Sequence, residues 1–405
     1  MLYIGIDWGE KVHHVCILNE AGARISRLQI PHSLSGFQRL DAERNKLNVP
    51  ARECLVAIET NHNVIVDYLL DREYIVYVIP PSSTEGYRNR HRSSGAYDDP
   101  SDAFLLASIV YTPSDRISHR RLQPNQALTQ EILGQVRLIE ALRQAIQRQG
   151  NQLRAALVRS YPVALTLFSE LTLPITLQFL QAYPSAAEAN SLSRETFEAF
   201  CRAHGDHRRD LAAQRYACLV EPLPAAQPAA VQACREQIRV LAQVLLLQVH
   251  CRQEALERLG QLFSQHQDAF LFISLPGTGK LLAPALLAKF GDHRARFAQA
   301  NEVQALAGTC PLTRRSGQRR EIRFRRGCDR EFRRIAQQFA LASREQSAWA
   351  AAFWQEIRSH CASDSHATRI LANRWLAIIW KLWQTRQAYD EAHHLQQRAQ
   401  RRIAK

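Results

Sequence analysis

The strongest constraint on the fold of this chain is a seven-residue repeat of apolar residues near its middle. The repeat is made by Ile132, Ile139, Ile146 and Leu153, and the same stripe contains Val136, Leu142 and Leu157. Gln and Arg fill the other positions, so the pattern predicts one long amphipathic helix that begins near Gln126. From about Gln126 the chain therefore changes character to long helix, and we call residues 1–115 before it the head.

A second stretch, 230–266, has the same character. Its apolar residues at three-to-four spacing are Ile238, Leu241, Leu245, Leu256, Leu259 and Phe263. Two such helices predict an antiparallel helical arm or a coiled coil between subunits, and the simpler alternative is two helices packed within one subunit. Residues 160–225 between them predict a smaller helical insertion.

The sequence pattern of the head predicts an α/β fold. Residues 1–30 contain three short apolar strands, a helix follows to about Asn48, and two further strands then alternate with helices. Adjacent strands followed by this alternation are typical of a mixed sheet with at least one antiparallel hairpin. Residues 80–98 predict a loop, and residues 100–111 a helix. We therefore divide the chain into a head at 1–115, a helical middle at 120–266, a mainly helical domain at 268–390 and a charged tail at 391–405.

Four carboxylates mark the head. Asp7 and Glu59 each end an apolar strand, and Asp99 and Asp102 lie three residues apart at the start of a helix. If they converge, their mutual repulsion is tolerable mainly when divalent cations neutralise it. The set therefore predicts a two-metal phosphoryl-transfer site that binds magnesium, with manganese as the alternative ion. The simpler alternative is that Asp98 and Asp99 only cap the helix.

The segment PGTGK, in the domain at 268–390, resembles a nucleotide-binding loop but departs from that pattern at two positions. Ser274 stands where the first glycine is needed, and Leu281 follows Lys280 where Ser or Thr is needed. We expect a tight turn between helices, in which Gly277, Gly279 and Lys280 either contact a DNA phosphate or simply form the turn.

The charge of the chain is unevenly distributed. The net charge is +14, but residues 1–115 carry 11 Lys and Arg against 15 Asp and Glu, a net of −4 that leaves +18 for the rest. Ten arginines lie between positions 314 and 334. This distribution predicts nucleic-acid binding by the later part of the chain. The arginines that we expect to contact DNA are Arg314, Arg315, Arg319, Arg320, Arg323, Arg325 and Arg326.

Ser316 lies in the middle of this basic segment and is followed by Gly317. A loop serine among arginines can attack a phosphate, because the guanidinium groups stabilise the developing negative charge. On the residues alone, an ordinary loop serine within a DNA-binding surface is the better interpretation.

Other features exclude whole classes of protein. The apolar stretches are too short to span a membrane and no signal peptide is evident, so we expect a cytoplasmic protein. Nine cysteines without a C-x-x-C pair argue against a zinc ribbon or a disulfide framework. Cys201 and His204 are interpreted as ordinary helix residues.

Five motifs in order resemble the insertion-sequence 110 family of transposases, which is related to the Piv-type DNA invertases. They are GIDWGEKVHHVCIL, VAIET, DDPSDAFLLA, LPGTGKLLAPALLAKFGD and ALAGTCPLTRRSGQRREIRFRRG. The resemblance covers residues 1–110 and 270–385 well, and the helical middle only in general character.

The resemblance implies a ribonuclease-H-like head, similar to Holliday-junction resolvases, in which Asp7, Glu59, Asp99 and Asp102 bind magnesium. It implies a transposase domain with a helix-hairpin-helix-like turn, whose nucleophile is Ser316. The implied partners are double-stranded donor and target DNA and a structured noncoding guide RNA. A homotetramer in which different subunits share an active site is implied as well, acting at the prokaryotic nucleoid.

The chain departs from the family at two places. Tyr97 and Asp98 stand where the family often has Lys-Thr, which leaves Asp98 open as a substitute ligand, and Asn61-His62 follows Glu59-Thr60 where Thr-Gly is common. Two other classes of function stay open: a metal-dependent junction resolvase or nuclease that uses water, and a nucleic-acid-binding protein without chemistry.

Overall fold

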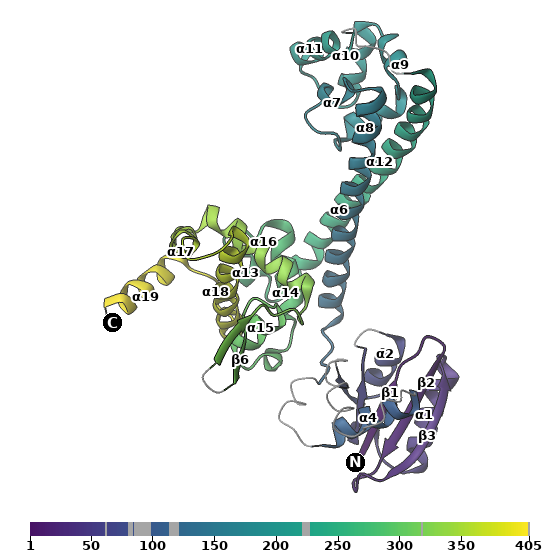
Figure 1. Ribbon diagram of the computed structural model, residues 1–405, viewed down its shortest axis with the longest axis vertical. Coiled ribbons are helices and arrows are strands. Elements are labelled where there is room, and N and C mark those ends of the chain that lie inside the picture. The colour runs from purple at the N-terminus through teal and green to yellow at the C-terminus, as the bar shows by residue number, and fades with distance from the viewer. Residues whose placement is uncertain are drawn as a thin grey trace. The chain divides into compact units, whose positions relative to one another are not determined.

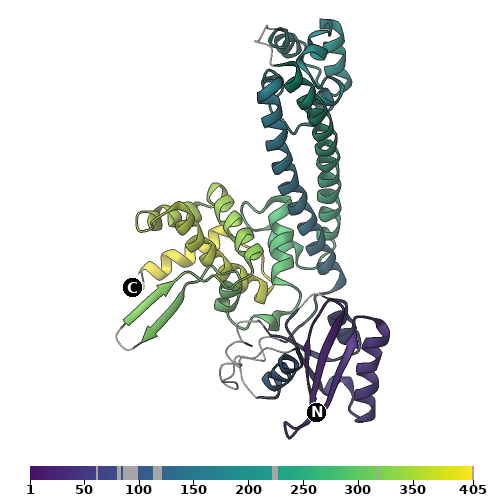
Figure 2. The same cartoon turned by 45° about the vertical axis from the view of Figure 1, so that its right-hand side comes forward.

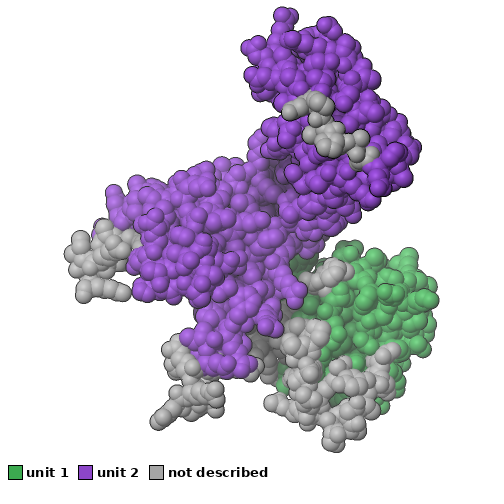
Figure 3. All heavy atoms as spheres, turned by 45° about the horizontal axis from the view of Figure 1, so that its top comes forward, with its two compact units in different colours: residues 1–124 green, residues 125–405 purple. Residues whose placement is uncertain are grey.

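The computed structural model describes residues 1–60, 63–79, 84, 99–112, 121–220, 227–316 and 319–403. The chain forms two compact units, unit 1 at residues 1–124 and unit 2 at residues 125–405 (Figure 3). The loop expected at 80–98 lies almost wholly outside the described residues, as do Asn61, His62, Tyr97 and Asp98.

Unit 1 is built on a mixed five-stranded sheet with the strand order β3-β2-β1-β4-β5 (Figure 1). The strands are β1 (Leu2–Asp7), β2 (Val12–Leu18), β3 (Arg24–Pro31), β4 (Cys54–Ile58) and β5 (Ile75–Val78). The first three are antiparallel, whereas β4 is parallel to β1 and to β5. All five strands predicted from the sequence are confirmed.

Helices cover both faces of this sheet. One face carries Ile4, Ile6 and Val56 and packs on α1 (Leu34–Lys46) and α2 (Val64–Asp71). Helix α1 is capped at its beginning, since the hydroxyl of Ser33 accepts a hydrogen bond from the Gly36 amide. A 3-10 turn (Ala51–Glu53) precedes β4.

The other face of the sheet packs on α4 (Asp99–Tyr111), whose buried side chains include Leu106, Ile109 and Val110. Gly5 lies directly under this helix, because a Cβ there would collide with the backbone of Ala103. Further along, the rings of Tyr3 and Tyr111 meet edge to face at 5.2 Å. The helix therefore runs antiparallel to β1, with its beginning toward the carboxyl end of that strand.

Unit 2 contains two long helices, α6 (Ala127–Ser160) and α12 (Pro228–Ser264), which lie side by side in Figures 1 and 2. Ile132 and Val136 share a core with Leu259, whereas Leu157 shares another with Ile238, so the two helices are antiparallel. The sequence left open a coiled coil between subunits. These helices pack on each other within one chain, and the intersubunit alternative stays a prediction.

Five short helices join the far ends of α6 and α12. They are α7 (Ala164–Leu167), α8 (Pro174–Ala182), α9 (Ala186–Asn190), α10 (Arg194–Ala203) and α11 (Arg209–Leu219). Cys201 is buried in their core, and the ring of His204 bonds to the Phe200 carbonyl at 2.8 Å. Cys201 is an ordinary residue of α10, as the sequence predicted, whereas His204 caps the carboxyl end of that helix.

The rest of unit 2 is a helical domain with one hairpin of strands. Its elements are α13 (Ala269–Ile273), α14 (Gly279–Phe290), a 3-10 turn (Arg294–Arg296), α15 (Ala300–Leu306), β6 (Leu312–Ser316), β7 (Arg319–Arg323), α16 (Arg330–Gln346), α17 (Ala348–Arg358), α18 (Asp364–Thr385) and α19 (Glu391–Ile403). Fully buried aromatic side chains such as Phe290, Phe332, Trp375 and Trp383 fill its core. The charged tail, for which no element was expected, forms α19.

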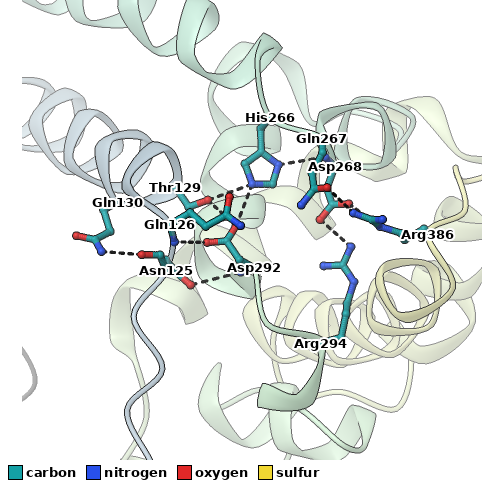
Figure 4. A network of polar contacts seen from close by, with 10 residues as sticks. All are labelled: Asn125, Gln126, Thr129, Gln130, His266, Gln267, Asp268, Asp292, Arg294 and Arg386. Carbon is teal, nitrogen blue, oxygen red and sulfur yellow. Dashed lines mark hydrogen bonds and ion pairs between the residues drawn. The ribbon is translucent and has the colours of Figure 1, made fainter. Parts of the chain in front are cut away.

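A buried polar network fixes the beginning of α6 (Figure 4). One carboxylate oxygen of Asp292 accepts from the Gln126 amide at 2.6 Å, and the other accepts from the Thr129 hydroxyl at 2.7 Å. The Asp268 amide donates to Nδ1 of His266, so Nε2 carries the hydrogen that points to Thr129 and Asp292. Burial alone would raise the pKa of Asp292, but these hydrogen bonds hold it below its ordinary value.

Candidate functional site

The first candidate region is the acid edge, which we define as Asp7, Glu59, Asp99 and Asp102. Asp7 is the last residue of β1, and Glu59 follows the last residue of β4. The two strands are parallel and Ile6 pairs with Ile58, so Asp7 and Glu59 occupy neighbouring positions at one edge of the sheet. The register therefore brings together two carboxylates that are 52 positions apart in the sequence.

The helix α4 supplies the other two members of the acid edge. Side chains alternate along a strand, so Asp7 lies on the same face as Gly5, the face that α4 covers. Asp102 directly precedes Ala103, the residue that touches Gly5. The first turn of α4 thus lies at the strand end that carries Asp7, as the predicted site requires.

Local contacts at the acid edge are polar. The buried hydroxyl of Thr84 donates to Oε1 of Glu59 at 3.0 Å. Asp7 and Asp102 are half-buried. The side chain of Asp99 lies outside the described part, and within that part no three His, Cys, Asp or Glu side chains form a group that could hold a metal ion. The donor chemistry of the edge, carboxylate oxygens alone, is the kind that magnesium prefers.

A histidine pair supports the backbone that follows Asp7. The Gly9 amide donates to Nδ1 of the fully buried His13 at 3.3 Å, and Nε2 of His13 lies 2.9 Å from Nδ1 of His32. Burial, together with the neighbouring His32 and His14, lowers the pKa of His13 to about 4. His13 is therefore neutral near pH 7, as an acceptor from the Gly9 amide must be. Nothing in the sequence pattern pointed to this role.

The second candidate region is the serine hairpin, which we define as β6 and β7, residues 312–323. Leu312 pairs with Arg323 at its base, and Ser316 pairs with Arg319 at its tip. The sequence suggested a loop serine, whereas Ser316 is the last residue of a strand. The side chains of Ser316, Arg314, Arg315, Arg319 and Arg320 lie outside the described part.

Three of the predicted DNA-binding arginines have described side chains. Arg323 is exposed and forms an ion pair with Glu321 at 2.6 Å, and Arg326 is also exposed. Arg325 is half-buried, and its carbonyl accepts a hydrogen bond from Arg333. The arginines therefore differ in how freely they can reach a phosphate.

A buried lysine in α14 was not predicted from the sequence. Nζ of Lys289, which is only 6% exposed, lies 2.8 Å from Asp329 and 2.6 Å from Glu331. Lys289 is separated from these carboxylates by 40 and 42 positions, so only tertiary packing reveals the pairs. Asp329 and Glu331, two of the acids within the basic segment, are thus engaged by Lys289.

The PGTGK segment follows α13 and leads into α14, so it is a turn between helices, as expected, and the element directly before it is a helix and not a strand. Gly277 and Gly279 both have positive φ, at 79° and 55°. The Gly277 amide donates a hydrogen bond to the Gln346 side chain at 2.9 Å. One of the groups expected to contact a phosphate is therefore already engaged. Lys280 is exposed, and its phosphate contact stays a prediction together with that of Gly279.

The chain matches two transposase family models. Residues 4–162 match the DEDD transposase of IS110 elements, and residues 269–355 match the transposase IS116/IS110/IS902 family. The first match contains all four residues of the acid edge, and the second contains Ser316. Within the described residues, no helix is long and apolar enough to cross a membrane.

Similar proteins match along nearly their full length. The "Mini-circle putative transposase for IS117" of Streptomyces coelicolor is 30% identical over 96% of this chain and 95% of its own. A 42 kDa protein of insertion element IS900 from Mycobacterium paratuberculosis is 22% identical over 96% and 98% of the two chains. A 43.6 kDa protein of insertion element IS110 from Streptomyces coelicolor is 22% identical over 94% and 93%. The chain therefore belongs to the IS110 family of transposases, enzymes that bind and recombine DNA.

Proposed function

We propose that this transposase excises and inserts a mobile DNA element with Ser316 as its nucleophile and with magnesium held by the acid edge. The observation that carries the proposal is the pairing of Ile6 with Ile58, which sets Asp7 and Glu59 side by side under α4. The mixed five-stranded sheet with carboxylates at its strand ends supports a ribonuclease-H-like unit 1.

In the proposed reaction, Oγ of Ser316 attacks a DNA phosphorus. As the bond between Oγ and phosphorus forms, the hydroxyl proton passes to a general base. The bond between phosphorus and one deoxyribose oxygen breaks, and that oxygen takes up a proton. A deoxyribose hydroxyl of the other DNA then attacks the same phosphorus and displaces the serine. Each bond broken is replaced by one of the same kind, so rejoining needs no high-energy cofactor.

The acid edge and the arginines have separate roles in this scheme. Asp7, Glu59, Asp99 and Asp102 would hold magnesium, and the bound ion supplies Lewis-acid stabilisation of charge on phosphate oxygens. The arginines of the serine hairpin, with Lys280 beyond it, hold the DNA backbone and fix its register.

We further propose that a structured noncoding RNA chooses the donor and target sites by base pairing, and that the protein acts as a homotetramer. A protein that binds the DNA backbone mainly through arginine recognises little base sequence by itself. This supports the proposal that an RNA selects the sites by base pairing. Exposed apolar side chains on the arm, including Leu138, Val158 and Leu247, support contact between arms of different subunits.

The test combines the purified protein, RNA transcribed from the noncoding DNA beside its coding region, and donor and target plasmids, with and without magnesium. We expect joined donor–target DNA only with magnesium, and a new insertion site when the pairing segment of the RNA is changed. Products that are only nicked or linear would indicate a nuclease that uses water. An insertion site that ignores the RNA would indicate a protein-only recombinase.

A further inference from the structure

Two arginines outside the predicted set meet at the base of the serine hairpin. Phe324 directly follows β7, and the guanidinium carbons of Arg333 and Arg369 lie 4.4 Å and 4.8 Å from the centre of its ring. Arg333 comes from α16 and Arg369 from α18. Three elements thus bring two positive charges to one partly exposed aromatic ring.

Arg333 is held in a fixed position. Its Nη2 donates to the carbonyl of Arg325 and contacts Sγ of Cys328. Gly308, whose φ is 61°, gives it room, because a Cβ there would collide with the same nitrogen. Such preorganisation lowers the entropy lost when a ligand binds.

The positive charge at this place is not balanced by the described residues. None of their carboxylates forms an ion pair with Arg333 or Arg369. The nearest acids in sequence, Asp329 and Glu331, are engaged by Lys289. Nε of Arg333 is buried and has no hydrogen-bond partner within the described part. Burial, with the charge of Arg333 second, lowers the pKa of Arg369.

We propose that Arg333 and Arg369 form a binding site for one phosphate of duplex DNA. Two guanidinium groups that lie within 5 Å of the centre of one ring can each donate to a phosphate oxygen, and the phosphate would supply the missing negative charge. DNA is favoured over RNA because Phe324 continues the strand pair that carries Ser316. The choice of DNA over RNA is the one part of this proposal that rests on the proposed function.

The position of the site relative to Ser316 gives it a role. Ser316 and Leu312 are four residues apart along β6, or roughly 14 Å at 3.4 Å per residue. With a rise of 3.4 Å per nucleotide along a DNA strand, this corresponds to about four nucleotide steps. A phosphate bound at the base would therefore fix the register of the DNA against the tip of the hairpin.

The test measures the affinity of the full-length protein for a short fluorescent duplex across a range of salt concentrations. All variants carry Ser316→Ala, so that no reaction interferes and the result does not depend on the identity of the nucleophile. We expect R333Q and R369Q each to weaken binding several-fold and to flatten the plot of log affinity against log salt by about one unit. The double variant should show little further change, because both groups hold the same phosphate.

Two controls separate a phosphate contact from a structural role. R369K should keep the salt slope and retain part of the affinity, since it keeps the charge without the fork. R374Q removes an exposed arginine on the same helix, about 140° around, and should change neither quantity. The proposal would be overturned if R333Q and R369Q kept the parent slope, or if they weakened binding of single-stranded RNA alone.

Discussion

The acid edge and the serine hairpin are built in opposite ways. The acid edge continues two central strands whose preceding residues, Ile6 and Ile58, are completely buried, and a helix covers the face on which it lies. The serine hairpin has only two strands, and its side chain Ile322 and the adjoining Phe324 are 61% and 47% exposed. Two strands alone are marginally stable in water.

This difference indicates what each region needs from a ligand. Asp7 and Glu59 directly follow paired strands in the core of unit 1, so the backbone at these two positions is held without DNA. The hairpin presents the exposed Arg323 and exposed apolar surface, which bound nucleic acid can cover. We infer that the two strand ends are preformed, whereas the serine hairpin gains stability when DNA binds.

The largest effect is expected from Ser316→Ala. Removing the nucleophile should lower recombination by more than about 10⁴-fold. DNA affinity should change by no more than about twofold, because the loss of one small hydroxyl alters the surface little. A recombination assay and a binding assay on the same preparation measure both. Thr313→Ala, an exposed position on the same strand, is the control and should recombine normally. Near-normal recombination by the Ser316 variant would show that the serine hairpin does not supply the nucleophile.

Single changes at the acid edge should have the next largest effect. We expect strand cleavage to fall by at least roughly 100-fold in each of four variants, Asp7→Asn, Asp99→Asn, Asp102→Asn and Glu59→Gln. Even residues that only hydrogen-bond to a metal ligand contribute about 10–100-fold to metal affinity or activity, and a ligand itself should contribute more. The requirement for magnesium should rise, which a titration of the ion measures. Asp71→Asn, exposed at the end of α2, should behave like the parent. If all four variants cleaved normally, the convergence of these residues would have no catalytic meaning.

Changes to the arginines of the hairpin should be smaller. Arg323→Ala, Arg325→Ala and Arg326→Ala should weaken binding of any DNA sequence, and removing each arginine–phosphate interaction should flatten the salt slope by about 0.9. We expect Arg326 to contribute more than Arg323, because Arg323 is already paired with Glu321. Affinity measured at several salt concentrations tests this. An effect limited to one DNA sequence would contradict backbone binding.

The smallest effect concerns pH. The pKa of His13 is about 4 in the folded chain, below its ordinary 6.5, so the stability that depends on neutral His13 is complete above pH 6.5 and declines between pH 6.5 and about 4. Protection factors of β2 amides, which correct for the slower intrinsic exchange at lower pH, should fall as the pH is lowered through this window, and His13→Asn should remove that response. Amides of α18, in unit 2, serve as the internal comparison. An equal fall in both places would assign the change to another group.

The sequence predicted the elements better than their contacts. Alternating apolar residues located β1 and β4, and the heptad repeat located α6, because these patterns are local. The pairing of Lys289 with Asp329 and the bond from the Gln126 amide to Asp292 join residues 40 and 166 positions apart, which no local pattern encodes. Arg333 looked like one more surface arginine until Gly308 and Phe324 showed where its side chain is held.

The central claim is that Ser316 attacks DNA, and its most direct test is the chemical identity of the reaction intermediate. A reaction with suicide DNA substrates, in which the leaving strand diffuses away, should trap the protein on DNA. Protease digestion and mass spectrometry should then find a nucleotide attached to Oγ of Ser316. A nucleotide on another residue, or cleaved DNA without any protein attached, would contradict the account.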